Sequence, residues 1–146
     1  MTLNELRDKI HENAVKHGFY QAENEIDQIG VDNRTAIKHA FFAQKIALII
    51  SEASEALEAD RKNRRADLNE FERLLASCAE EAELSEEDAF KYAYNCAIKG
   101  TVEEEIADSV IRNLDLCGSE KINIQRHVEL KMRYNELREY KHGKAY

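Results

Sequence analysis

The sequence predicts an all-α protein, a helical bundle of about five to six helices. Its 146 residues contain no proline and only five glycines, at positions 18, 30, 100, 118 and 143, each where a helical pattern stops. No run of residues alternates apolar and polar side chains between turn signals, so strand signals are absent. A chain of this length is expected to form a single domain over residues 1–146.

Helix-capping residues divide the chain into successive helices. Thr2 with Glu5 is a predicted capping box that opens the first helix, which is expected to end at Gly18. Residues 19–31 are predicted to form a polar connection, and a long helix then runs from about residue 32 to residues 61–63.

The second half of the chain carries the same helix signals. N-cap residues are predicted to start three further helices: Asp67, Ser85 and Thr101, the last in a capping box with Glu104. The helix from Ser85 is expected to end at Gly100, and the helix from Thr101 is expected to break at Gly118. A last helix extends to about residue 138.

Composition argues against several functional classes. The formal net charge of −8 argues against a nucleic-acid partner, which requires a basic surface. The three cysteines are odd in number and widely spaced, as expected of reduced thiols in a cytoplasmic protein. The N-terminus is too polar for a signal peptide, and the longest central apolar run, residues 46–50, is far too short to span a membrane. We therefore expect a soluble protein with no membrane partner.

Two short acidic motifs are the main indication of function. Glu52 and Glu55 lie three residues apart in one predicted helix, and Glu105 and Asp108 lie three residues apart in another, so each pair projects from one side of its helix. Four carboxylates from two packed helices supply the oxygen ligands and the negative charge that Mg²⁺ requires. The motifs thus indicate metal-assisted phosphate chemistry.

Each motif also has a purely structural interpretation. Glu52 and Glu55 are predicted to lie within an apolar surface, where an ion pair with Lys45 or an arginine could compensate their charge without a metal. Glu105 and Asp108 share a stripe with Arg112 that an ordinary solvated helix face would also explain. The second motif gains weight only because the first one needs a partner.

A group of polar and basic residues on the last predicted helix could bind phosphate. His127, Lys131, Asn135 and Arg138 fall within about 80° of one another on a helical wheel. Lysine and arginine near a carboxylate-bound metal are suited to phosphate oxygens. A basic surface stripe that pairs with the acidic one explains the same residues.

Three segments together resemble a known family. Residues 49–57 (IISEASEAL), 104–111 (EEIADSVI) and 131–138 (KMRYNELR) are similar to the ExxE, ExxD and C-terminal Lys-x-x-x-Asn patterns of MazG-like all-α nucleoside triphosphate pyrophosphohydrolases, in the same order. The superfamily also contains the dimeric dUTPases. The motifs cover about a third of the chain, and the helical layout covers most of it.

The resemblance implies hydrolysis of a nucleoside triphosphate between its α- and β-phosphates, giving the monophosphate and pyrophosphate. It implies that Glu52, Glu55, Glu105 and Asp108 hold Mg²⁺, for which Mn²⁺ could substitute, and that one glutamate of the first motif, Glu55 or Glu52, orients or deprotonates the attacking water. The implied phosphate-binding residues come from two helices: Lys131, Asn135, Arg138 and Arg112. A homodimer or homotetramer is implied as well, consistent with more apolar positions over residues 41–57 than one helix face can bury.

The base-binding residues are the least defined part of this expectation. The chain has no tryptophan to stack on a base, so Phe41 and Tyr134 are the candidates, with Gln44 as a polar contact. The stretch between the acidic motifs is also longer than in compact members of the family. The alternative function is a non-catalytic helical module that binds nucleotides or another protein.

Overall fold

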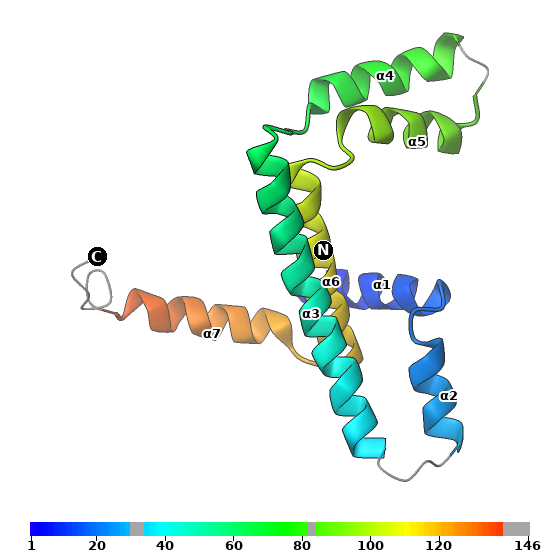
Figure 1. Ribbon diagram of the computed structural model, residues 1–146. Helices are drawn as coiled ribbons and strands as arrows, with labels where there is room; N and C mark the ends of the chain where they lie inside the picture. The colour runs from blue at the N-terminus through cyan, green and yellow to red at the C-terminus, as the bar shows by residue number, and fades with distance from the viewer. Residues whose placement is uncertain (30–33, 82–83, 139–146) are drawn as a thin grey trace. The chain divides into compact units, whose positions relative to one another are not determined.

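The computed structural model describes residues 1–29, 34–81 and 84–138, and within these residues the only regular secondary structure is helical (Figure 1). The described helices are α1 (Leu3–Lys16), α2 (Gln21–Ile29), α3 (Arg34–Arg61), α4 (Leu68–Glu81), α5 (Glu86–Ala97), α6 (Val102–Ser119) and α7 (Ile124–Glu136). The all-α prediction is confirmed. The seven described helices exceed the five to six predicted, and the expected start of the long helix at residue 32, with Gly30 and Gly143, lies outside the described residues.

The predicted N-caps all start helices. In the capping box of α1, the Glu5 backbone N–H donates to Thr2 Oγ1 at 3.1 Å, and the Thr2 backbone N–H donates to Glu5 Oε2 at 2.7 Å. Asp67 and Ser85 cap α4 and α5 in the same way, each accepting from the backbone N–H three residues later. These caps satisfy backbone donors that have no partner inside the helix.

The predicted polar connection over residues 19–31 is wrong, because Gln21–Ile29 form helix α2. Gly18 does end the first helical stretch, with a positive φ of 83° that glycine adopts without strain. The chain then starts a new helix at once, because the Gln21 backbone N–H donates to the Gly18 carbonyl at 3.1 Å. No capping residue of the Ser, Thr, Asp or Asn type precedes Gln21, so the sequence carries no start signal for α2.

The chain packs as two compact units, and α3 and α6 contribute residues to both. Unit 1 comprises Met1–Phe42 and Asn113–Tyr146, and unit 2 comprises Ala43–Arg112. Unit 1 thus contains α1, α2 and α7, and unit 2 contains α4 and α5. The expectation of a single domain stays a prediction.

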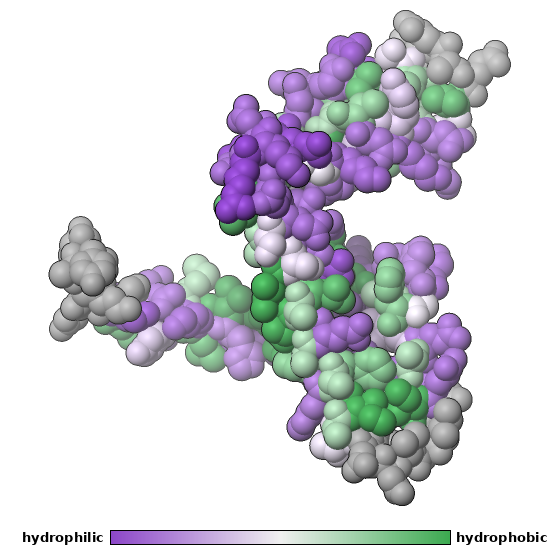
Figure 2. Space-filling view, viewed as in Figure 1, coloured by the Kyte–Doolittle hydropathy of each residue, from purple (hydrophilic) through white to green (hydrophobic). Residues whose placement is uncertain are grey.

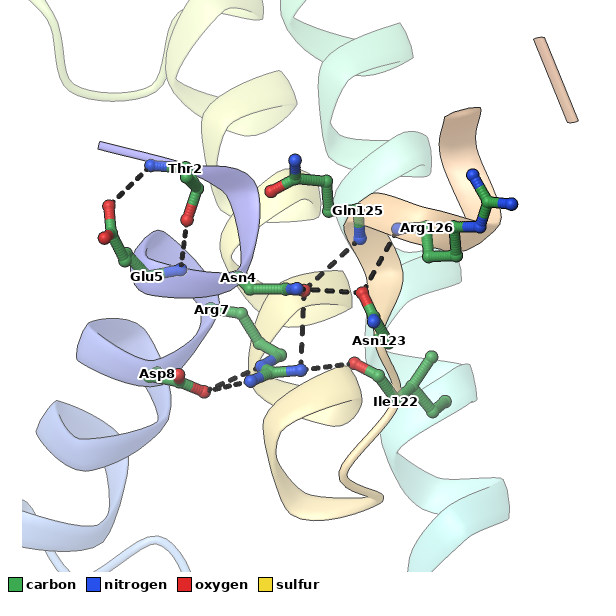
Figure 3. Close-up of polar contacts among 9 residues, drawn as sticks. All are labelled: Thr2, Asn4, Glu5, Arg7, Asp8, Ile122, Asn123, Gln125 and Arg126. Atoms are coloured by element: carbon green, nitrogen blue, oxygen red, sulfur yellow. Dashed lines mark hydrogen bonds and ion pairs between the residues drawn. The ribbon is translucent and has the colours of Figure 1, made fainter. Parts of the chain in front are cut away.

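Polar contacts join the start of α1 to the start of α7 in unit 1 (Figure 3). The Asn4 side-chain amide donates to Asn123 Oδ1 at 2.8 Å, and Asn4 Oδ1 accepts from the Gln125 backbone N–H at 3.3 Å. The Arg7 guanidinium donates to the Ile122 carbonyl at 2.5 Å. Asn123 also caps α7 by accepting from the Arg126 backbone N–H. This cluster of hydrogen bonds therefore links the start of α1 to the start of α7.

A second cluster in unit 1 joins α1 to the end of α6. Asp115 accepts from the Tyr20 hydroxyl at 2.8 Å, and its other oxygen lies 2.8 Å from His11 Nδ1. Burial and the Asp115 contact raise the pKa of Tyr20 above its usual value. Gly118 remains inside α6 instead of breaking it, and a Cβ there would lie 2.5 Å from the His11 Cβ. The glycine permits this close approach, and the chain turns only at Lys121, where φ is 54°.

Unit 2 contains a helical hairpin formed by α4 and α5. Three alanines spaced four residues apart on α5, namely Ala89, Ala93 and Ala97, are at most 7% exposed. The Asp67 backbone N–H donates to the Ala97 carbonyl at 3.1 Å, and the Val102 backbone N–H donates to the Arg64 carbonyl at 3.2 Å. These bonds join the α3–α4 connection to the last residue of α5 and to the first residue of α6. They fix the start of α6 relative to the end of α3 within this unit.

Large apolar side chains remain at the surface of several helices (Figure 2). On α3 the exposed residues include Ile46, Leu48, Ile50 and Leu57, and on α6 they include Ile106, Val110 and Ile111. The buried apolar residues of the described chain are mostly small, with Leu114, Leu116 and Tyr20 the largest. None of the described helices combines the length and apolarity needed to cross a membrane.

Candidate metal centre

Three of the four predicted carboxylates converge in unit 2. Glu52 and Glu55 come from α3 and Glu105 from α6, and each offers one oxygen within 4.8 Å of the others. Glu52 is buried, Glu105 is half-buried and Glu55 is exposed. Glu52 therefore lies away from solvent and Glu55 does not, and the predicted apolar surroundings of the pair stay a prediction. The group combines one buried oxygen donor with one that solvent can reach.

The negative charges in this group act on one another. Burial raises the pKa of the Asp108 carboxyl, and the charge of Glu52 raises it further, whereas Arg112 opposes the shift. Burial also raises the pKa of Glu105, with the charge of Glu55 as the next contribution. Like charges held close together, one of them buried, favour a cation among them. The fourth predicted ligand, Asp108, thus shares the electrostatic environment of the three that converge.

Arg112 supplies part of the compensating charge. Its Nε donates to Glu52 Oε1 in a close ion pair, and the Glu52 side chain is 5% exposed against 43% for Arg112. The sequence also allowed a purely structural role, in which an arginine rather than a metal compensates the charge of Glu52 and Glu55. For Glu52 such an ion pair is present. This ion pair joins Arg112 to the Oε1 atom of Glu52. A phosphate contact from Arg112 stays a prediction.

Two residues near these carboxylates, Glu104 and Tyr94, are not among the site residues predicted from the sequence. The Glu104 side chain accepts a hydrogen bond from the Gly100 backbone N–H rather than from Thr101, although Thr101 Oγ1 does accept from the Glu104 N–H at 3.3 Å. The Glu104 carboxyl also raises the pKa of Tyr94, after the larger effect of burial. Glu104 could have been noticed because it precedes Glu105. Tyr94 carries no sequence signal, because its contact depends on how α5 meets α6.

The predicted phosphate-binding residues near the C-terminus belong to unit 1. Lys131 and Arg138 both lie against the ring of Tyr134, with the Lys131 ammonium 5.0 Å and the Arg138 guanidinium 5.9 Å from the ring centroid. The structure thus groups three of the predicted site residues, all of them exposed, and Asn135 is exposed on the same helix. Their action on a substrate held by the carboxylates stays a prediction.

The two remaining base-binding candidates lie on α3. Phe41 is half-buried and Gln44 is exposed. Phe41 belongs to unit 1 and Gln44 to unit 2. Their assignment to the base stays a prediction.

Comparison with known protein families, with curated proteins and with solved structures finds no match to this chain. The resemblance to MazG-like enzymes therefore stays an expectation drawn from the three short sequence motifs.

Proposed function

We propose that this chain is a MazG-like, Mg²⁺-dependent nucleoside triphosphate pyrophosphohydrolase. The observation that carries the proposal is the approach of Glu52, Glu55 and Glu105 oxygens to within 4.8 Å of one another. Oxygens on opposite sides of a Mg²⁺ ion bound at about 2.1 Å lie about 4.2 Å apart, so only small side-chain movements would complete such a site. The all-carboxylate donor set also suits this hard cation better than zinc or copper.

The residues divide the chemistry between them. Glu52, fixed by Arg112, would hold the metal from the buried side, and Glu105 with Asp108 would hold it from α6. The bound metal would neutralise phosphate charge and lower the pKa of coordinated water. Glu55, the exposed member, would accept a proton from the attacking water. The water oxygen would bond to the α-phosphorus, the bond from that phosphorus to the α–β bridging oxygen would break, and pyrophosphate would leave.

The test is incubation of the purified chain with a panel of NTPs and dNTPs and Mg²⁺, with monophosphate and pyrophosphate resolved from orthophosphate. Glu55→Gln is expected to abolish turnover while the helical circular dichroism stays unchanged, because an exposed side chain contributes little to packing. Glu58→Gln is the matched control, since Glu58 is an exposed glutamate on the same helix that pairs with Arg61 instead.

The outcomes separate the proposed enzyme from the alternatives. Pyrophosphate release that Glu55→Gln removes and Glu58→Gln retains supports the proposal. Saturable Mg²⁺ and nucleotide binding without turnover indicates a nucleotide-binding sensor. Absence of metal binding in calorimetry with Mg²⁺ and Mn²⁺ indicates a helical interaction module, in which the carboxylates serve only structure.

The proposed enzyme would act as a homodimer or homotetramer. Ile46, Leu48, Ile50 and Leu57 on α3 are between 37% and 61% exposed, and burying such residues between copies would stabilise an oligomer. Ile50→Glu is expected to lower the sedimentation coefficient, because it places a charge at the most exposed of these positions. A wild-type chain that sediments as a monomer would contradict this part of the proposal.

A further inference from the structure

The α4–α5 hairpin of unit 2 carries an aromatic cluster that no predicted site residue belongs to. The rings of Phe71 and Phe90 meet edge to face at 5.6 Å, and the rings of Phe90 and Tyr94 stack with an interplanar angle of 22° at 5.9 Å. Phe90 is nevertheless 50% exposed. Hydrophobic residues reach the surface of this hairpin among hydrophilic ones (Figure 2). The cluster thus offers an aromatic surface to solvent while Phe71 and Tyr94 hold the Phe90 ring in place.

The cluster lies next to the candidate metal centre. Tyr94, whose ring stacks on Phe90, is in the last turn of α5, and Glu104 and Glu105 are in the first turn of α6. Burial, the nearby Glu104 carboxyl and the charge of Asp108 raise the pKa of Tyr94 to about 12. Phe90 lies four residues before Tyr94, about 6 Å along α5. An aromatic face and a group of metal-binding carboxylates therefore adjoin within one unit.

We propose that Phe90, supported by Tyr94, stacks on the base of a nucleotide whose phosphates lie at the carboxylates of α3 and α6. The inference rests on the proposed function and adds the residue that distinguishes a nucleoside triphosphate from an inorganic polyphosphate. Stacking suits this position because every base has a π-face, and a half-exposed ring fixed by two aromatic neighbours loses little freedom when a base covers it. Stacking on a ring discriminates little between bases, so this surface would tolerate different bases.

Equilibrium binding to two probes tests the inference. The probes are inorganic tripolyphosphate and the α,β-methylene analogues of a purine and a pyrimidine nucleoside triphosphate, each with Mg²⁺, in titration calorimetry. Phe90→Leu keeps an apolar side chain of similar volume and removes the ring. It is expected to weaken binding of both nucleotide analogues about five- to tenfold and to leave tripolyphosphate binding unchanged.

Two further variants serve as controls. Phe90→Tyr keeps the ring and is expected to keep the wild-type affinity for both analogues. Tyr92→Leu removes a ring that is 49% exposed on the same helix but lies beside Cys96, so it is expected to change neither affinity. Circular dichroism melts of each variant report whether the hairpin remains folded.

The outcomes separate this inference from the proposed function. Equal nucleotide affinity in the wild type and Phe90→Leu, or equal loss in Phe90→Leu and Tyr92→Leu, overturns the stacking role while the metal centre stands. Equal loss of affinity for tripolyphosphate and for the nucleotide analogues in Phe90→Leu overturns it as well. A wild-type chain that binds no probe in the presence of Mg²⁺ overturns both.

Discussion

Arg112 and Glu52 allow the electrostatics of the candidate site to be measured through stability. The perturbation is Arg112→Gln, alone and combined with Glu52→Gln, in the whole chain. Breaking a fully buried ion pair by removing one partner costs about 3–5 kcal/mol, because the other charge remains buried and uncompensated. Here Glu52 is 5% exposed but Arg112 is 43% exposed, so solvent screens the pair and we expect Arg112→Gln to cost about 2 kcal/mol.

The double variant reveals whether the two residues act together. Glu52→Gln leaves a half-exposed guanidinium that water can solvate, so it is expected to cost about 1 kcal/mol or less. In the double variant the buried site carries no charge, and its cost is expected to fall below the sum of the single costs by about 1–2 kcal/mol. The assay is urea unfolding followed by circular dichroism at 222 nm, in EDTA. Costs that add within about 0.5 kcal/mol would refute the ion pair.

Repeating the same unfolding curves with Mg²⁺ tests the metal centre in the same variants. At a free Mg²⁺ concentration one hundred times the Kd, binding to the folded state adds about 2.7 kcal/mol of stability. Arg112→Gln is expected to gain at least as much as the wild type, because the cation replaces the lost positive charge. Glu52→Gln is expected to gain less, because it has lost a carboxylate ligand. Equal gains in all variants would show that Mg²⁺ acts elsewhere.

Three further perturbations concern residues outside the metal-binding set. In the unfolded chain the Tyr94 hydroxyl ionises near pH 10, whereas in the folded chain its pKa is about 12, so the wild type is expected to lose stability as pH rises between these values. Tyr94→Phe should lose less stability between about pH 9.5 and 11.5, measured by urea unfolding. An equal loss in both proteins would contradict the raised pKa of Tyr94. Gly118→Ala is expected to destabilise by about 1–3 kcal/mol, because the new Cβ would lie 2.5 Å from the His11 Cβ; an unchanged melting temperature would show that the contact relaxes freely. Thr2→Ala removes the α1 cap and should cost about 1 kcal/mol in thermal unfolding, so a helix that melts unchanged would argue that this terminus is frayed in solution.

The helix starts could be predicted where the chain carries a capping side chain. Thr2, Asp67, Ser85 and Thr101 each satisfy a backbone N–H three residues later, a contact that depends on local sequence alone. Helix α2 lacks such a residue, and it could not be predicted for that reason. Gly118 shows the opposite case, since a glycine that resembles a helix stop instead admits a neighbouring helix.

The candidate metal centre could be predicted in part. The spacing of three residues places Glu52 beside Glu55 on any helix, and the structure brings Glu105 to them. The exposure of Glu55 could not be predicted, because a helical wheel gives the direction of a side chain but not what covers it. The partner of Arg112 could not be predicted either, because an arginine on the same helix face as Glu105 and Asp108 could contact phosphate, solvent or a carboxylate.

The sequence by itself determined the all-helical fold, most helix boundaries and the carboxylate pairs, because these follow from interactions within three or four residues. The tertiary structure decided which carboxylates converge, that Arg112 binds Glu52 and that Tyr94 of the aromatic cluster lies near Glu104. The Arg112–Glu52 contact joins residues 60 positions apart, so it exists only once α3 and α6 have packed. Local spacing supplies the chemical groups, and the packing of distant segments sets the distances between them.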